Sequence, residues 1–248
     1  MTTCGLKVSD GSVIILEFGG VNMCGRYTIT VSMEELMIRY LTNDSTMIQY
    51  APKYNVAPMQ FIPAVIHNGT ENRVGELRWG LVPSWAKDQK MGSRMINARA
   101  ETLLEKASFK RLISNRRCII PADGFYEWKQ QGNSKQPMRI VMRDGDIFSM
   151  AGLYDIWIDP EGKKLSTCTI ITTTPNSLMA DIHDRMPVIL HRDNESEWLS
   201  RDNRDESALM ALLRPYEASK MNAYPVSSAV GNVRHDSKEL IEEIRESG

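Results

Sequence analysis

Apolar and polar positions alternate, or form short apolar runs, over most of the 248-residue chain, and this pattern predicts more strands than helices. Valine, isoleucine, threonine and aromatic residues, which favour strands, are concentrated in these runs. The expected strands are residues 61–67, 74–81, 117–120, 125–129, 137–143, 147–158 and 165–173. Asn68-Gly69 should form a turn, and 137–143 should pair with 147–158 across Asp144-Gly145.

Helical spacing is limited to short segments. Met33, Leu36 and Tyr40 share one face of a helix that begins after Ser32, and Glu35 completes a capping box. Further helices are expected at 195–199, 206–213 and 237–244, and residues 96–106 should begin extended and become helical. No alternation of strands with helices, internal repeat or Pro/Gly/Ser-rich linker interrupts the pattern. The sequence therefore predicts one α+β domain with a largely antiparallel, barrel-like sheet flanked by helices.

The composition is that of a globular protein. A hydrophobic share of 42% and a charged share of 25% exclude disordered, collagen-like and coiled-coil chains. No apolar run approaches the roughly 20 residues that span a bilayer. The four cysteines and four histidines lack zinc-ligand spacing, so we expect neither a metal site nor a cofactor, and no disulfide framework. Cys118 and Cys168 lie in apolar runs and should be buried thiols.

The first 22 residues differ in sequence pattern from the rest of the chain. No basic segment precedes their short apolar piece and no small-x-small cleavage site follows it, so we expect no secretory signal and a cytoplasmic protein. Gly19-Gly20-Val21 could be encoded by GGAGGTG, which resembles a bacterial ribosome-binding site, and this favours Met23 as the true start. The alternatives are a real N-terminal strand or a propeptide. If Met23 is the start and is removed, Cys24 carries a free α-amine beside its thiol.

The formal net charge of −1 conceals an uneven distribution. Residues 73–117 contain eleven basic and four acidic residues, whereas residues 192–248 contain eight basic and twelve acidic residues. The basic segment also contains Trp79 and Trp85, a mixture that suits single-stranded nucleic acid because cations follow phosphates and aromatic rings stack on bases. The alternative is a solvated basic face above a core tryptophan.

Four polar segments lie where function is often placed, between turns and apolar runs. They are MCGRY (23–27), INARAET (96–102), GFYEW (124–128) and DIHDRMP (181–187). With YNVAP, RWGLVPSW, PADGFYEW, KQPMRI and AVGNV they follow in order from Met23 to about Val233. On these segments the chain resembles the SRAP family (SOS-response-associated peptidase; abasic-site processing proteins). The resemblance implies an N-terminal extension (1–22), an SRAP domain (23–235) and an acidic C-terminal tail (236–248).

The resemblance implies a sensor of abasic sites in single-stranded DNA that protects the site through a covalent crosslink to an N-terminal cysteine. The chemistry of Cys24 agrees with this role. A primary amine condenses with the aldehyde of an open abasic sugar to give an imine, and the adjacent thiol can then close a thiazolidine ring. An α-amine with a pKa of about 8 is substantially neutral at physiological pH, unlike a lysine. The alternative for Cys24 is a small buried residue in the first strand.

Three further residues match the active-site residues of that family. Glu127, which desolvation between aromatic neighbours would make a better proton carrier, is assigned to proton transfer in sugar opening and imine formation. Asn97 is assigned to holding the Cys24 amine or the sugar hydroxyls, and His183 to proton transfers that include strand cleavage or crosslink reversal. The structural alternatives are a surface carboxylate, a cap residue and a satisfied histidine, respectively.

Three arginines each lie two residues after one of these positions, a spacing that places both side chains on one face of an extended segment. Arg26, Arg99 and Arg185 are therefore expected to bind the phosphates that flank the lesion. Pro58 and Trp85 are expected to shape or stack the DNA path, whereas Trp79, Phe125 and Trp128 suit the core better. Relatives can carry a second aromatic residue directly after the Trp85 position, where this chain has Ala86.

Two other classes of function compete with covalent capture. A cysteine-type peptidase would cleave the chain before Cys24, which would make residues 1–22 part of a propeptide. A non-covalent single-strand binder would use the same basic surface without chemistry. The expected partner in the first and third cases is DNA, and the sequence names no protein partner.

Overall fold

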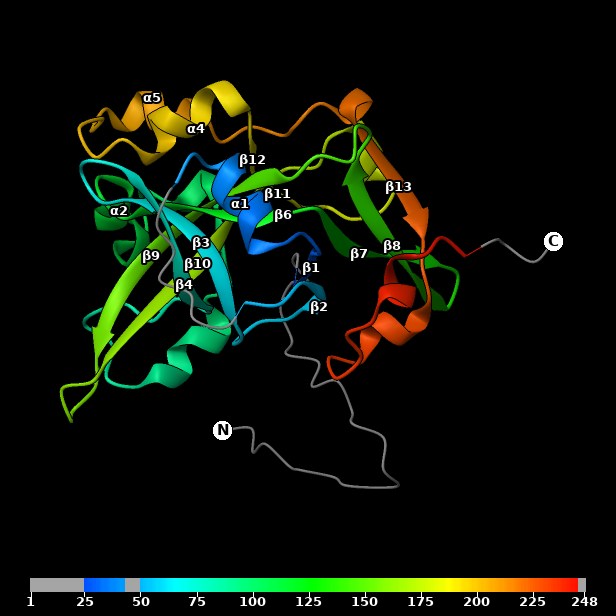
Figure 1. Cartoon of the computed structure of the whole chain (residues 1–248), viewed down its shortest axis with the longest axis horizontal. Helices are drawn as coiled ribbons and strands as arrows, with labels where there is room; N and C mark the ends of the chain where they lie inside the picture. Colours follow the sequence, from blue (N-terminus) through cyan, green and yellow to red (C-terminus); the bar gives the residue numbers. More distant parts are fainter. Residues whose placement is uncertain (1–24, 43–49, 245–248) are drawn as a thin grey trace.

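The computed structural model describes residues 25–42 and 50–244 (Figure 1). Its strands are β1 (Arg26–Ile29), β2 (Lys53–Val56), β3 (Phe61–His67), β4 (Asn72–Trp79), β5 (Asn97–Arg99), β6 (Arg117–Ala122), β7 (Gly124–Gln131), β8 (Ser134–Met142), β9 (Phe148–Ile158), β10 (Lys164–Thr173), β11 (Met186–Pro187), β12 (Ile189–Leu190) and β13 (Met221–Pro225). Its α-helices are α1 (Met33–Arg39), α2 (Ala107–Ile113), α3 (Ser177–Ala180), α4 (Arg192–Leu199) and α5 (Glu206–Ala211). Short 3-10 turns include η1 (Gln89–Arg94), η2 (Ala100–Thr102), η4 (Ser228–Gly231) and η5 (Lys238–Ile241).

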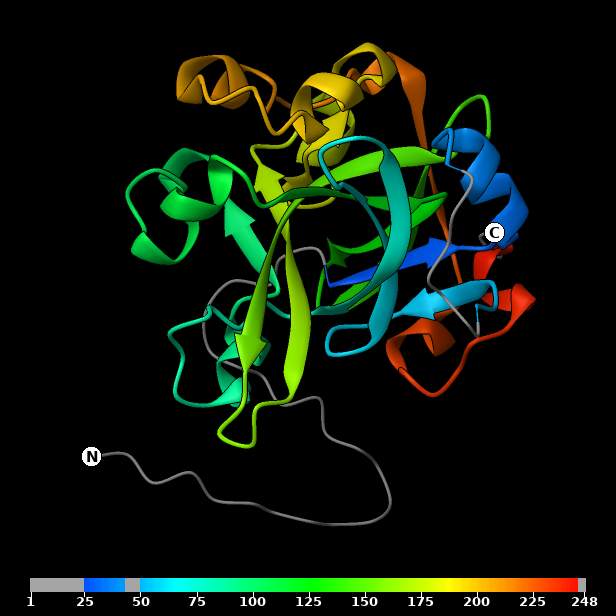
Figure 2. The ribbon, with the colours of Figure 1, turned by 60° about the vertical axis from the view of Figure 1, so that its left-hand side comes forward.

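A closed ring of five strands forms the centre of the domain. β10 pairs with β4, β4 with β3, β3 with β6, β6 with β9, and β9 returns to β10. Figure 2 shows the long β9–β10 hairpin on one side of this ring and β3 and β4 on another. Closure leaves no unpaired sheet edge within the ring, and its interior is filled by apolar side chains. The predicted α+β fold with a barrel-like sheet is confirmed.

Most pairings are antiparallel, as predicted, but β10 runs parallel to β4 and to β5. A second sheet, in the order β13-β8-β7-β1-β2, is antiparallel throughout. The predicted hairpin across Asp144-Gly145 is wrong, because β8 lies in the second sheet and β9 in the barrel. Gly145 does adopt the positive φ of a tight turn, but that turn passes the chain from one sheet to the other. A local turn signal carries no information about which sheet receives the next strand.

The helices differ from prediction mainly in length. α1 begins after Ser32 with the predicted capping box, in which Ser32 and Glu35 bond each other's backbone amides. The expected acidic helix 237–244 is only the short turn η5. α2 was not expected, because seven residues after an uncapped Lys106 carry little helical signal; Phe109, Leu112 and Ile113 are nevertheless buried on it. Among the described helices, none is long and apolar enough to cross a membrane.

Several predicted core residues are buried. Cys118 and Cys168 are free thiols inside the barrel, and burial raises the pKa of both. Trp79 and Phe125 are fully enclosed, as expected, whereas Trp128 is only partly buried. Trp198 of α4 covers the barrel by donating its indole N–H to the carbonyl of Cys118, at 2.9 Å. Helices α4 and α5 lie together over this end of the barrel in Figure 1.

Candidate functional site

The first candidate group lies where β1 runs antiparallel to β7. The register pairs Arg26 with Tyr126 and Thr28 with Gly124. Continued by one residue, the same register places Gly25 beside Glu127. Glu127 is buried, with 3% of its surface exposed, although glutamate rarely leaves water. Cys24 lies outside the described residues, one peptide bond before Gly25.

The second candidate group gathers at the C-terminal end of β10. β5 lies along this strand and pairs Arg99 with Thr172, while β11 pairs Pro187 with the same threonine. Asn97, two residues before Arg99, is 7% exposed. The register therefore brings the INARAET segment and the DIHDRMP segment together, although 78 residues separate them in sequence.

Arg185 is the most extensively bound side chain of this second group. Its guanidinium donates to both carboxylate oxygens of Glu101, at 2.9 and 3.0 Å, and to the carbonyl of Thr172, at 2.7 Å. Partial burial raises the pKa of Glu101, but hydrogen bonds from Arg185 and the charges of Arg185 and Arg99 outweigh it and hold this pKa below its ordinary value. Glu101 therefore stays ionised at neutral pH and neutralises Arg185. Sequence reasoning gave Glu101 no role.

His183 is mostly buried and follows helix α3. Its Nδ1 lies 3.1 Å from the backbone nitrogen of Arg185 and 3.1 Å from a carboxylate oxygen of Asp184. Nδ1 accepts the backbone N–H of Arg185 and lies beside the Asp184 carboxylate, so the ring is fixed by contacts at this nitrogen.

Arg26 faces a different part of the molecule from Arg99 and Arg185. Its guanidinium donates to Asn55 Oδ1 at 2.9 Å and to the carbonyls of Val230 and Gly231, at 2.7 and 3.1 Å. Asn55 in turn donates from Nδ2 to the carbonyl of His235, at 2.8 Å. The start of β1 is thus fastened to the AVGNV segment, and the geometry favours positioning over the phosphate contact predicted for Arg26.

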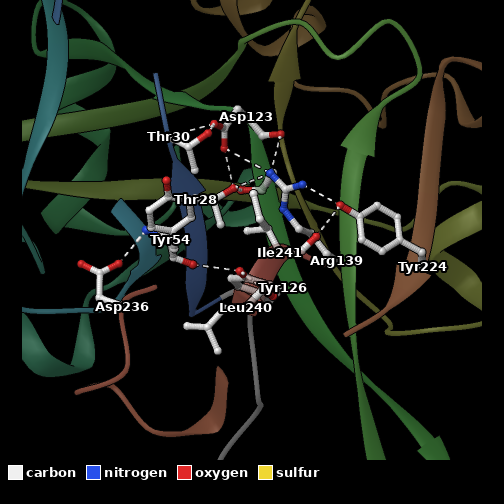
Figure 3. Close-up of polar contacts among 11 residues, drawn as sticks. Thr28, Thr30, Tyr54, Asp123, Tyr126, Arg139, Tyr224, Asp236, Leu240 and Ile241 are labelled. Carbon is white, nitrogen blue, oxygen red and sulfur yellow. Dashed lines mark hydrogen bonds and ion pairs between the residues drawn. The ribbon is translucent and has the colours of Figure 1, made fainter. Parts of the chain in front are cut away.

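A wider polar network connects β1 and β7 to residues 236–241, called here the C-terminal segment (Figure 3). The turn η5 of this segment also packs against β2. Asp123 accepts hydrogen bonds from Thr28 of β1 and from Thr30 just after it. A carboxylate oxygen of Asp123 also lies 3.4 Å from a guanidinium nitrogen of Arg139 on β8. Arg139 donates to Tyr224, whose hydroxyl donates to the carbonyl of Ile241.

A second set of hydrogen bonds attaches the same C-terminal segment to the neighbouring strand β2. Tyr126 donates to the carbonyls of Tyr54 and Leu240, and Asp236 accepts the amide of Tyr54. The sequence motifs contain Tyr54, Asp123, Tyr126 and Arg139 but do not reveal these roles, and Tyr224, Leu240 and Ile241 lie outside every motif.

The two residues predicted to shape or stack the DNA path differ in exposure. Trp85 is 54% exposed at the end of the RWGLVPSW segment. Pro58 is half-buried and precedes Met59, a non-glycine residue with a φ of 71°. Such a backbone conformation costs energy and is found most often where function requires it. A carboxylate and an imidazole are groups that transfer protons, an amide is a group that donates and accepts hydrogen bonds, and arginines bind anions. Within residues 25–42 and 50–244, no cluster of histidine, cysteine and acidic side chains is arranged to hold a metal.

Comparisons with known proteins agree with this description. The model of the SOS response associated peptidase (SRAP) family matches residues 23–233. Abasic site processing protein YoqW of Bacillus subtilis (strain 168) is 53% identical over 222 residues, covering 89% of this chain and 99% of that protein. Abasic site processing protein HMCES of Gallus gallus is 36% identical over 225 residues, covering 78% of this chain and 66% of that protein. A crystal structure of a Bacteroides thetaiotaomicron protein superposes with a TM-score of 0.82 at 29% identity, covering 90% of this chain and 100% of that chain.

Proposed function

The chain belongs to the SRAP family, and on that premise we propose that it captures abasic sites in single-stranded DNA through a covalent bond to Cys24. The family match begins at Met23, which supports a mature chain that starts at Cys24 once Met23 is removed. The names of the relatives, abasic site processing proteins, support the same substrate. A cytoplasmic location stays a prediction.

The observation that carries the proposal is the register of β1 on β7. It leads the chain from Gly25, the residue after Cys24, past the buried carboxylate of Glu127. A carboxylate kept from water beside a terminal amine is suited to accept and return its proton. Residues 1–22, if they remained attached, would convert that amine into an amide and remove its nucleophilicity.

The proposed reaction balances without an added reagent. The Cys24 amine attacks the aldehyde carbon of the opened sugar, and the carbinolamine loses water to give an imine. The Cys24 sulfur then adds to the imine carbon while the nitrogen takes up a proton, which closes the thiazolidine ring. Glu127 carries the protons of sugar opening and dehydration, and Asn97 holds the amine or the sugar hydroxyls. Arg99 and Arg185 bind the flanking phosphates, and Pro58 and Trp85 guide the strand.

His183 has a separate role in this proposal. With its Nδ1 held by the Arg185 amide and beside the Asp184 carboxylate, it serves proton transfers to and from the sugar, including strand cleavage by β-elimination and reversal of the crosslink. Arg26 acts through the AVGNV segment to fix the start of β1.

A second candidate is a cysteine-type peptidase that cleaves before Cys24, which the family's description as peptidases favours. Cleavage there would release the same α-amine, so the two activities are compatible. Peptide hydrolysis of unrelated substrates without any adduct on DNA would favour the peptidase alone.

The test compares three chains: one beginning at Cys24, the same chain with Cys24→Ala, and the complete 248-residue chain verified by intact mass. Each is incubated with single-stranded DNA that contains one abasic site. We expect a heat-stable adduct only with the free N-terminal cysteine, at the mass of protein plus DNA minus one water. Salt-sensitive binding without an adduct, or an equal adduct from the unprocessed chain, would overturn this mechanism.

A further inference from the structure

Asn176 directly precedes the short helix α3 and contacts several separate parts of the chain. Its side chain caps α3 and also donates to the segment before β13, and its backbone amide contacts β11. We propose that Asn176 is a positioning residue, which holds the α3 turn so that the imidazole of His183 is correctly placed for proton transfer. This inference rests on the proposed function, because it deepens the role assigned there to His183.

His183 lies in the loop that connects β10 to β11. The two ends of this loop lie side by side, because Thr173 of β10 pairs with Met186 of β11. Between these positions the regular structure is the helix α3, which spans only Ser177–Ala180. A helical turn of this length is unstable in water by itself, since forming the first turn costs more conformational entropy than its hydrogen bond returns. The position of His183 therefore depends on the contacts that hold α3.

Met179 links the cap of α3 to His183. Its backbone amide donates to Oδ1 of Asn176 at 2.9 Å, which is the N-cap contact of the helix. Its carbonyl accepts the backbone amides of Ile182 and His183, each at 2.8 Å. The side chain of Met179 is fully buried, which fixes this residue in the core. A displacement of Asn176 would therefore move the backbone of Met179 and, with it, the backbone of His183.

Asn176 also attaches α3 to parts of the chain that are distant in sequence. Its Nδ2 donates to the carbonyl of Tyr216 at 2.7 Å and lies 3.3 Å from the sulfur of Met221. Its backbone nitrogen lies 3.4 Å from the sulfur of Met186. Met186 and Met221 are fully buried, so these contacts connect α3 to the core. Asparagine supplies the cap acceptor and the donor on one short planar group, and neither alanine nor aspartate reproduces both.

The other side of His183 is held independently of Asn176. Its Nδ1 accepts the backbone N–H of Arg185 at 3.1 Å. The guanidinium of Arg185 is itself bound to Glu101 and to the carbonyl of Thr172. The imidazole is thus located from one side through Asn176 and α3, and from the other side through Arg185. Loss of the first anchor leaves the second in place, so it should displace the ring without releasing it.

Reversal of the crosslink is the step that needs this placement. The ring nitrogen of the thiazolidine expels the Cys24 sulfur, which takes up a proton, and water adds to the resulting imine carbon. Loss of the Cys24 amine then regenerates the aldehyde, so the reaction consumes one water and needs no other reagent. His183 gives the proton to the sulfur and recovers a proton from the added water. Both transfers require the imidazole to lie within hydrogen-bond reach of these atoms.

The test measures formation and reversal of the adduct separately, with the chain that begins at Cys24 and single-stranded DNA that contains one abasic site. Purified adduct is mixed with an excess of a longer abasic DNA, and transfer of the protein to the longer strand reports reversal on a denaturing gel. We expect reversal to slow by about a hundredfold in His183→Ala, which removes the imidazole, and by about tenfold in Asn176→Ala, which displaces it. Asn176→Ala should slow reversal more than formation, in which Glu127 carries the protons.

The double variant Asn176→Ala/His183→Ala shows whether Asn176 acts through the histidine. If it does, the double variant reverses at the rate of His183→Ala alone. Asn176→Asp keeps the cap of α3 but loses the donor to Tyr216, so its rate should lie between those of the parent and Asn176→Ala. Thermal melting reports folding, and Asn176→Asp carries the comparison if the alanine variant does not fold. The matched control is Ser177→Ala, at the exposed first residue of α3, which should reverse like the parent.

Three results would overturn the inference. Losses that multiply in the double variant, or an equal loss in formation and reversal, would mean that Asn176 only supports the fold. An unchanged reversal rate in His183→Ala would leave Asn176 nothing to position, although adduct formation by the parent would keep the capture of abasic sites intact. Absence of any adduct from the parent would overturn the proposed function and this inference together.

Discussion

The guanidinium of Arg185 forms a bidentate pair with the carboxylate of Glu101, in which its two terminal nitrogens donate hydrogen bonds of 2.9 and 3.0 Å. Paired and parallel contacts of this kind fix orientation as well as charge. An arginine expected to bind a DNA phosphate therefore already has an internal counter-charge. A phosphate at this position must compete with Glu101 for the guanidinium, and we expect this competition to lower the affinity for undamaged single-stranded DNA.

Replacing Glu101 with glutamine should strengthen non-specific DNA binding. Glutamine keeps a hydrogen-bond acceptor for Arg185 but removes the negative charge, so the full charge of the guanidinium becomes available to phosphate. We expect higher affinity for undamaged single-stranded DNA and a salt slope steeper by about 0.7, the value of one additional phosphate contact. Fluorescence anisotropy across a salt series measures both quantities. An unchanged slope would show that Arg185 does not reach the DNA backbone.

The same ion pair predicts a pH dependence of stability. Because the pKa of Glu101 is lower in the folded chain than in the unfolded chain, its ionised form favours folding. This contribution is present above the unfolded pKa of about 4.3 and is lost as the pH falls through the folded value. The difference in urea midpoint between the parent and Glu101→Gln should therefore be constant near neutral pH and shrink in acid. A difference that grew as the pH fell would contradict the assigned direction.

Glu127→Gln should separate chemistry from binding. The amide has the shape of the carboxylate but cannot carry a proton, so adduct formation with abasic DNA should slow while affinity for undamaged single strand stays close to that of the parent. Gel analysis of adduct against time and anisotropy on undamaged DNA provide the two readouts. A parallel loss of both would indicate a folding defect or a binding role.

The elements of the fold were predictable where a local sequence pattern determines them, and the pairings between distant strands were not. The strand at Phe61–His67 and the capped helix after Ser32 occur as expected, because an apolar run and a capping box are both local properties. The pairing of β8 was not predictable, since it lies between β7 and the distant β13, and β13 shows only weak alternation. Parallel pairing of β10 with β5 also leaves no mark in either segment.

The candidate site divides in the same way. The motifs around Asn97, Glu127 and His183 stand out in the sequence, but their partners do not. Glu101 and Asn55 are ordinary polar residues whose roles come from distant contacts, 84 positions away for Glu101 with Arg185 and 175 for Asn55 with Val230. Spacing alone suggested that Arg26 and Arg185 act alike, whereas the first faces carbonyl groups and the second a carboxylate.

Asn55→Ala should weaken the attachment of residues 230–235, which precede the C-terminal segment. Asn55 is buried, donates to the carbonyls of Val230, Asn232 and His235, and accepts from Arg26. Its removal leaves buried polar groups without partners, so we expect a loss of about 1–3 kcal/mol in the free energy of unfolding. Urea denaturation measures this loss. The control is Gln130→Ala, an exposed amide that donates to the carbonyl of Gly132, which should change stability by less than about 0.5 kcal/mol.

The buried pair of Asp123 and Arg139 gives the sharpest test of the network in Figure 3. Both side chains are about nine-tenths buried, and Gly124 packs so closely that a Cβ there would lie 2.8 Å from Arg139 Nε. Asp123→Asn leaves the guanidinium in this enclosed space without a counter-charge, and its amide group opposes the donating N–H of Thr30. We expect a loss of about 3–5 kcal/mol in the free energy of unfolding.

A second substitution distinguishes loss of the ion pair with Arg139 from loss of the hydrogen bonds that Asp123 accepts from Thr28 and Thr30. Adding Arg139→Met to Asp123→Asn removes the unpaired charge while keeping much of the side-chain volume, so the double variant should recover part of the lost stability. The coupling energy from the four urea curves should then be favourable and well above the 0.5 kcal/mol expected of independent sites. Additive losses would instead mean that Asp123 stabilises the fold through Thr28 and Thr30 alone, and that Arg139 is held by Tyr224.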